Sequence, residues 1–204
     1  MHTWTRLLSW TLVFLWPMAG ANLSAAPVSP TEAVRALVQA IGSIKVANNG
    51  ALSPADIAHN DAVAKRVNSM LDIASVSQRV LGRYWQERTP TEQKAFTDLL
   101  TELFVNIAYP RSAEFFGDLQ INITDERIQG ENAEVQTTVS DPKEGLISVD
   151  YRLQQRNGAW HVRDIILDDV SLIRNLRSQC QQIIAEHSYD ELIRRMQEKL
   201  NEEL

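Results

Sequence analysis

The sequence contains one cysteine, Cys180, and no second long apolar run after its first 26 residues. A single cysteine excludes an internal disulfide, and no cysteine stands beside the expected cleavage region to accept a lipid anchor. A transmembrane helix needs about 20 consecutive apolar residues, so the chain after residue 26 is expected to be soluble and free to diffuse. Positive charge is also scarce: the formal net charge is −6, which disfavours binding to nucleic acid or to an anionic membrane surface.

Recognisable catalytic motifs are absent from the sequence as well. It contains no HExxH, GxSxG, Walker or dinucleotide glycine pattern and no clustered metal-ligand spacing, so no cofactor and no metal are expected. Cys180 and His187 are seven residues apart, but Cys180 lies in an apolar stripe, where cysteine usually packs as a small hydrophobe. Asp168 and Asp169 are adjacent, and such a pair more often ends a strand than binds a cation.

The first 26 residues have the layout of a cleavable secretory signal. Arg6 precedes an apolar stretch from Leu7 to Trp16, and small residues follow. This stretch is too short for a transmembrane helix, which needs about 20 residues. We therefore expect export, with cleavage after Ala21 or Ala26, and a single domain over residues 27–204.

The apolar pattern is helical over the next part of the chain. It predicts helices from Thr31 to about Asn48, from Ser53 to Leu71, and from Asp72 to Leu81. A further helix is expected to begin at Thr89 and to end at Pro110, because proline does not continue a helix.

Alternating apolar and polar residues follow, and this pattern is typical of strands with one buried face. The alternation covers residues 119–123, 133–139, 147–153 and 160–162. Asn157-Gly158 predicts a two-residue hairpin turn between the last two strands. Two more amphipathic helices finish the chain, with Ser188 between them. The order predicts one α+β domain built on an antiparallel sheet of about four strands.

Asp164 is the strongest candidate for acid–base chemistry. Strand alternation from Trp160 and Val162 puts it on the apolar side of the sheet. An inward carboxylate in a small α+β cavity could act as a general base, as in ketosteroid-isomerase-like enzymes. It could equally hydrogen-bond nearby backbone or a tyrosine such as Tyr84 or Tyr109. A small exported cavity enzyme that uses Asp164 as acid or base is therefore the alternative function.

Ordered landmarks run from Thr31 to Leu200. The first group is Leu81-Gly82-Arg83-Tyr84-Trp85 with Gln93, Phe96 and Tyr109; the later groups are Val149-Asp150-Tyr151, Trp160 with Val162-Arg163-Asp164, Val170-Ser171-Leu172 with Arg177, and Tyr189-Asp190-Glu191-Leu192-Ile193 before Lys199. In this order and spacing they resemble the MlaC family of periplasmic phospholipid-binding proteins, also called toluene-tolerance or ABC transporter auxiliary proteins.

The resemblance implies a soluble periplasmic carrier rather than an enzyme. Such a carrier holds a diacyl phospholipid by its acyl tails. It shuttles the lipid between an outer-membrane lipoprotein/porin complex and an inner-membrane ABC transporter complex with its substrate-binding subunit, and so maintains outer-membrane lipid asymmetry. The implied fold is a twisted antiparallel sheet covered by helices, with an apolar cavity between sheet and helices. Smaller side chains replace the family's usual aromatics near Leu176 and Cys180, which would alter acyl-chain selectivity or pocket volume.

Apolar residues of the sheet and helices are the candidate wall of this cavity. Enclosing two tails needs a volume toward the upper end of the usual range of roughly 300–1,000 Å³. The alternative for each residue is ordinary core packing. The candidates are Leu81, Leu103, Ile107, Tyr109, Ile147, Val149, Tyr151, Trp160, Val162, Ile166, Leu172 and Leu176. Arg174 and Arg177 are weaker candidates for contact with the head-group phosphate, their alternative being solvated helix charges.

Overall fold

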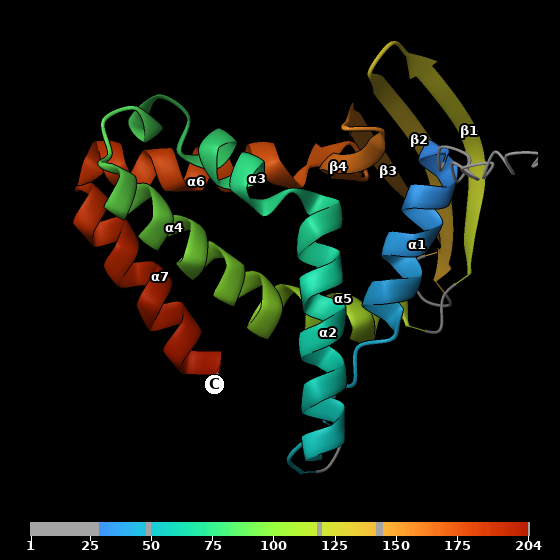
Figure 1. Cartoon of the computed structure of the whole chain (residues 1–204), viewed down its shortest axis with the longest axis horizontal. Helices are drawn as coiled ribbons and strands as arrows, with labels where there is room; N and C mark the ends of the chain where they lie inside the picture. Colours follow the sequence, from blue (N-terminus) through green and yellow to red (C-terminus); the bar gives the residue numbers. More distant parts are fainter. Residues whose placement is uncertain (1–28, 48–49, 118–119, 142–144, 204) are drawn as a thin grey trace, which may run out of the picture.

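A computed structural model describes residues 29–47, 50–117, 120–141 and 145–203. The predicted signal segment and Leu119 lie outside these ranges. The helices are α1 (Pro30–Gly42), α2 (Pro54–Leu71), α3 (Ile73–Leu81), α4 (Pro90–Leu103), α5 (Tyr109–Phe116), α6 (Leu172–Glu186) and α7 (Tyr189–Glu203), as labelled in Figure 1. The strands are β1 (Ile121–Gln129), β2 (Asn132–Asp141), β3 (Gly145–Arg156), β4 (Ala159–Leu167) and β5 (Val170–Ser171).

Helices α2 and α4 begin as the sequence predicts, at a serine or threonine followed by proline. Helix α1 begins in the same way at Pro30, one residue before the predicted Thr31. The side chains of Ser29, Ser53 and Thr89 each accept a hydrogen bond from a backbone N–H in the first turn. In α1 and α4 the carboxylates of Glu32 and Glu92 accept a hydrogen bond from the cap residue's N–H, which completes a capping box. Proline fits the first turn because its missing N–H would have no partner there.

The predicted end of the first helix is wrong. Helix α1 ends at Gly42 rather than near Asn48, and the Ser43 hydroxyl donates to the Ala40 carbonyl at 2.7 Å. The chain then leaves the helix because Asn60 of α2 hydrogen-bonds both the N–H and the carbonyl of Lys45. The backbone N–H and carbonyl of Lys45 therefore find their hydrogen-bond partners in a side chain of a neighbouring helix. The sequence pattern of this segment alone does not reveal that contact.

Pro110 does not end the fourth helix. A π-helical turn (Phe104–Ala108) joins α4 to α5, and the N–H of Tyr109 donates to the carbonyl of Phe104, five residues back. Pro110 then lies in the first turn of α5, where the absence of an N–H is tolerated. The π turn thus lets the chain stay helical from α4 through α5.

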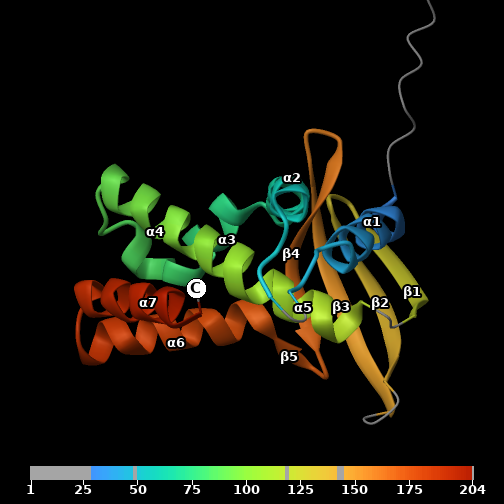
Figure 2. The same ribbon diagram turned by 90° about the horizontal axis from the view of Figure 1, so that it is seen from below.

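The sheet is antiparallel with strand order β1-β2-β3-β4-β5, and its fifth strand is only two residues long. Asn157 and Gly158 have φ angles of 51° and 78°, which are typical of the two-residue turn that the sequence predicts. Figure 2 shows α1 and α5 beside the sheet, while α4, α6 and α7 extend away from it. The predicted fold class, a mixed α+β structure on an antiparallel sheet, is confirmed.

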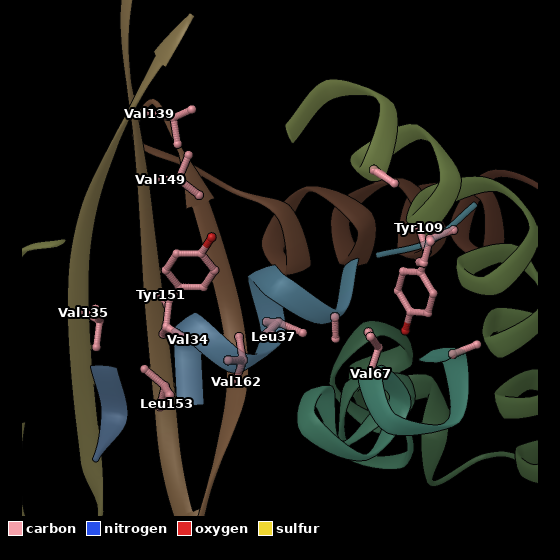
Figure 3. Close-up of a cluster of buried hydrophobic side chains, with 14 of the residues drawn as sticks. Val34, Leu37, Val67, Tyr109, Val135, Val139, Val149, Tyr151, Leu153 and Val162 are labelled. Carbon is pink, nitrogen blue, oxygen red and sulfur yellow. The ribbon is translucent and has the colours of Figure 1, made fainter. Parts of the chain in front are cut away.

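Buried apolar residues form two clusters. The sheet cluster joins α1, α2 and α5 to the inner face of the sheet. It includes Leu37 of α1, Val67 of α2 and Tyr151 of β3 (Figure 3). The helical cluster joins α3, α4, α6 and α7 and includes Phe96, which is fully buried. Phe104 packs against both clusters, so the π turn connects the two parts of the core.

Candidate functional site

An apolar hollow of about 280 Å³ lies between β4 and the helices that surround it. Its wall is mostly aliphatic and aromatic, and its polar side chains include Ser112, Arg163 and Asp164. The lining residues are Ile41, Leu71, Val76, Phe104, Ala108, Tyr109, Ser112, Val162, Arg163, Asp164, Ile165, Leu172, Ile173 and Leu176. We call this space the main hollow.

A second apolar hollow of about 90 Å³ lies against the inner face of the sheet. Its wall includes Val149 and Tyr151, and it shares Ile41, Ser112, Ile165 and Leu172 with the main hollow. Leu172 is 43% exposed although it lines both spaces, so it lies where they meet solvent. We call this second space the side hollow. Each hollow is smaller than the volume that the sequence analysis expects for two tails.

The predicted wall residues fall into two groups. Tyr109, Val162, Leu172 and Leu176 line the main hollow, and Val149, Tyr151 and Leu172 line the side hollow. The other six line neither space: Leu81 and Leu103 pack in the helical cluster, Ile147 and Trp160 pack in the sheet cluster, Ile166 is buried, and Ile107 is half-buried.

Several wall residues were missed by sequence reasoning, including Ile41, Val76, Ala108 and Ile165. Ile41 and Val76 carry a signal, because they lie on apolar helix positions, but that signal is the same for packed core. Ala108 lines the main hollow because it lies on the π turn. The residue pattern does not predict a π turn at this place.

The tyrosines of the wall are neutral. Burial raises the pKa of Tyr109 above its usual range, and the Tyr109 hydroxyl donates to Asn68 Oδ1 at 2.6 Å. Burial also raises the pKa of Tyr151 to about 12. Both rings therefore add apolar surface without charge. The hydroxyl of Tyr109 is already hydrogen-bonded to Asn68 of α2.

Asp164 follows a break in the alternation of β4. Leu153 pairs with Val162, whereas Arg152 pairs with Asp164, so the register shifts at this point and Arg163 is the extra residue of a β-bulge. The bulge changes the phase of the strand, and Asp164 pairs with the exposed Arg152. Its side chain is only 13% exposed and lines the main hollow, but it reaches that place through a bulge, which leaves no alternation signal of its own.

The Asp164 carboxylate holds the beginning of α6. Its Oδ2 accepts from the Ser171 hydroxyl at 2.6 Å, and its Oδ1 accepts from the N–H of Ile173 at 3.2 Å. The backbone alternative of the sequence analysis is therefore correct. The tyrosines are engaged elsewhere, since Tyr84 accepts from Arg83 and Tyr109 donates to Asn68.

Cys180 and His187 do not form a nucleophilic pair. Burial raises the pKa of the Cys180 thiol to about 11, so the thiol is protonated at neutral pH. It packs in the helical cluster, while His187 is exposed at the end of α6. Cys180 is therefore a small hydrophobe of the core.

The two predicted head-group arginines are exposed on α6 and line neither hollow. The guanidinium of Arg177 lies next to Gly82, so near that a Cβ there would be 3.0 Å from its Nη2. Arg174 contributes its backbone N–H to the cap of α6, donating to Ser171 Oγ. Neither position places the guanidinium in the apolar space.

Within the described ranges, no three His, Cys, Asp or Glu side chains gather as a metal site. Nor does any helix there have the length and apolarity needed to cross a membrane.

Residues 40–198 match the MlaC protein family. The chain belongs to the MlaC family. Its fold is similar to that of a phospholipid-binding protein from Ralstonia solanacearum, solved in complex with a phospholipid, with a TM-score of 0.67. The two chains are 18% identical, and the match covers 84% of this chain and 94% of that one. Comparison with curated protein sequences gives no significant match.

Membership of the MlaC family confirms the resemblance given by the sequence landmarks. The group Leu81-Gly82-Arg83-Tyr84-Trp85 falls at the end of α3 and in the 3₁₀ turn that follows it. The Val162-Arg163-Asp164 group contains the bulge of β4, and Ser171 caps α6. The first group and Ser171 thus lie where one element changes into the next, and Val162, Arg163 and Asp164 line the main hollow.

Proposed function

We propose that this chain is a phospholipid carrier that encloses acyl tails in the main and side hollows. The observation that carries the proposal is the apolar main hollow between β4, α3, α5 and α6, in a chain of the MlaC family. The similarity of its fold to a protein from Ralstonia solanacearum in complex with a phospholipid supports the same cargo.

The energetics suit a carrier that both takes up and releases lipid. Each methylene that leaves water contributes about 0.8 kcal/mol, so exposed tails in the periplasm are strongly unfavourable. In a bilayer the same methylenes are already away from water. Exchange between the bilayer and an apolar hollow is therefore near balance, and contacts with partner proteins decide its direction.

The present volumes suit part of a lipid rather than two complete tails. The main hollow, at about 280 Å³, is at the lower end of usual ligand pockets, which begin at roughly 300 Å³. Ile41, Ile165 and Leu172 contribute to both walls and stand where the two spaces meet. We propose that displacement of these side chains joins the hollows when a diacyl lipid is bound.

The cellular role that we propose follows from the family and from the secretory layout of the first 26 residues. The carrier is soluble in the periplasm and moves phospholipid between an outer-membrane lipoprotein/porin complex and an inner-membrane ABC transporter complex with its substrate-binding subunit. By doing so it maintains the lipid asymmetry of the outer membrane.

We propose no enzymatic activity for the chain. Both carboxylate oxygens of Asp164 are engaged in hydrogen bonds that hold the beginning of α6. These two hydrogen bonds orient the carboxylate toward the start of α6, where it has a structural role. No observation therefore favours the acid–base alternative over the carrier.

Filling the main hollow tests the proposed function. Ala108→Phe places a ring in this space, so the purified variant should contain several-fold less phospholipid per chain than the wild type. Extraction followed by mass spectrometry measures the lipid, and circular dichroism checks the fold. The matched control is Ala58→Phe, because Ala58 is exposed on α2 and lines neither hollow. A folded Ala108→Phe variant with the full lipid content would refute this assignment of the main hollow.

A further inference from the structure

A third hollow, of about 430 Å³, differs from the other two in its polarity. It lies over the face of the sheet that carries the exposed Arg127 and Arg152, and Arg79 of α3 reaches it from the side. The lining residues are Arg79, Arg127, Gln129, Asn132, Ala133, Glu134, Arg152, Leu153, Arg163 and Asp164. We call it the arginine hollow. It holds four guanidinium groups and two carboxylates in a chain whose net charge is −6.

The sheet register brings charges of the hollow into one row. Arg127 pairs with Glu134, Glu134 with Arg152, and Arg152 with Asp164, across β1 to β4. Arg152 Nε lies 4.0 Å from Glu134 Oε2, and Arg152 Nη1 lies 3.9 Å from Asp164 Oδ2. These distances exceed the roughly 2.7–2.9 Å of a charge-assisted hydrogen bond. Asp164 is already engaged by α6, and Arg127 Nε donates to Asp125 Oδ2 at 2.8 Å. The two carboxylates of the hollow therefore satisfy its arginines only in part.

Two guanidinium nitrogens of the hollow are buried without a partner. In the part of the chain that the structure describes, neither Arg79 Nη2 nor Arg163 Nε makes a hydrogen bond. Burial first, and then the positive charge of Arg163, lower the pKa of Arg79. The bulge of β4 therefore holds Arg163 near a second, half-buried cation. A buried N–H donor without a partner costs stability, and so does the repulsion between two neighbouring cations. A bound anion would reduce both costs.

We propose that the arginine hollow binds a phosphate-type oxyanion. Guanidinium groups offer paired N–H donors that match the oxygen spacing of phosphate. The oxyanion is either the head-group phosphate of the carried lipid, an identification that rests on the proposed function, or free phosphate. The first source is geometrically close, because Arg163 and Asp164 also line the main hollow.

The experiment titrates inorganic phosphate into the lipid-stripped full chain at constant ionic strength and follows the heat of binding. The wild type should bind, and Arg163→Gln should raise the Kd by about tenfold or more, as expected for a lost charge-assisted hydrogen bond. Arg66→Gln is the matched control, since Arg66 is exposed on α2 and lines none of these hollows, and its Kd should be unchanged.

A second arm repeats the titration with protein loaded with phosphatidylglycerol. Loss of phosphate binding identifies the head group as the natural occupant, whereas retained binding identifies free phosphate. Should Arg163→Gln not fold, Arg127→Gln tests the same hollow at an exposed position. Absence of phosphate binding by the stripped wild type, or an equal Kd in the folded variants, overturns the proposal. A chain that binds phosphate but takes no lipid from vesicles would instead refute the carrier function alone.

Discussion

At the scale of single residues, Cys180 shows how burial removes chemical reactivity. The thiol packs in the helical cluster, and burial raises its pKa from 9.0 to about 11. Because the raised pKa belongs to the folded state, the stability that it contributes is fully present below about pH 9 and is lost as the pH rises toward 11.

Alkylation measures this protection of Cys180. Only a thiolate reacts readily with iodoacetamide, so the native chain at pH 8 should be modified far more slowly than the chain unfolded in urea. The modified fraction is followed by mass spectrometry over time. Equal rates in the two states would contradict the buried position of the thiol. The chain provides its own reference, because Cys180 is its only cysteine.

Asp164 shows why a residue's chemistry is harder to predict than its element. The sequence correctly predicts that residues 160–162 begin a strand, and it singles out Asp164 as a buried carboxylate with a structural alternative. The side to which it points depends on the bulge at Arg163, which the period of two does not contain. After the bulge, the carboxylate lies beside the first turn of α6, where it accepts hydrogen bonds from the Ser171 hydroxyl and the N–H of Ile173.

At the scale of elements, the junction between α3 and α6 depends on Gly82. Its φ is +56° and its ψ is −121°, a backbone conformation that is restricted essentially to glycine. A Cβ at this position would lie 2.3 Å from Nε2 of Gln181, which donates to the Leu81 carbonyl at 3.2 Å. Gln181 therefore links α6 to the end of α3 only because no side chain intervenes.

Gly82→Ala should consequently lower the free energy of unfolding by about 2–3 kcal/mol, through backbone strain and loss of this contact. Gly42→Ala is the control, since a Cβ there meets nothing within 4 Å and the residue ends α1 without a positive φ. That change should leave stability within about 1 kcal/mol of the wild type. Urea denaturation compares the two. A Gly82→Ala variant as stable as Gly42→Ala would contradict the argument.

Element starts were more predictable than element ends. A capping residue and a proline are written in the local sequence, as at Ser53 and Thr89, and both helices begin there. The end of α1 depends on Asn60 of another helix, and the continuation through Pro110 depends on a π turn. The first depends on a residue that is distant in sequence, and the second depends on backbone geometry. Neither can be read from the local residue types.

At the scale of the whole molecule, the two apolar hollows are separated by a few side chains. Ile165 is half-buried, packs against the sheet cluster and lines both spaces. The sequence predicts that the inner strand face and the helical stripes are apolar. It does not predict which of these residues surround a void, because that depends on how far the helices stand from the sheet. Val149 lines a hollow while Ile147, two residues earlier, is packed core.

Ile165→Ala should join the two hollows. We expect a loss of about 2 kcal/mol in stability, at the low end for such a truncation because the residue is only half-buried. The proportion of diacyl phospholipid to single-tailed lipid in the purified protein should rise. Ile57→Ala, at an exposed position of α2, should change neither quantity. Urea denaturation and mass spectrometry of extracted lipid provide the two readouts, and an unchanged lipid ratio would contradict separation by Ile165.

The helical passage from α4 through α5 reaches from the far end of the molecule to the sheet, with Phe104 in contact with both parts of the core. Ala108 of the same passage borders the main hollow. Binding beside Ala108 would therefore contact a continuous helical segment that also packs against α7.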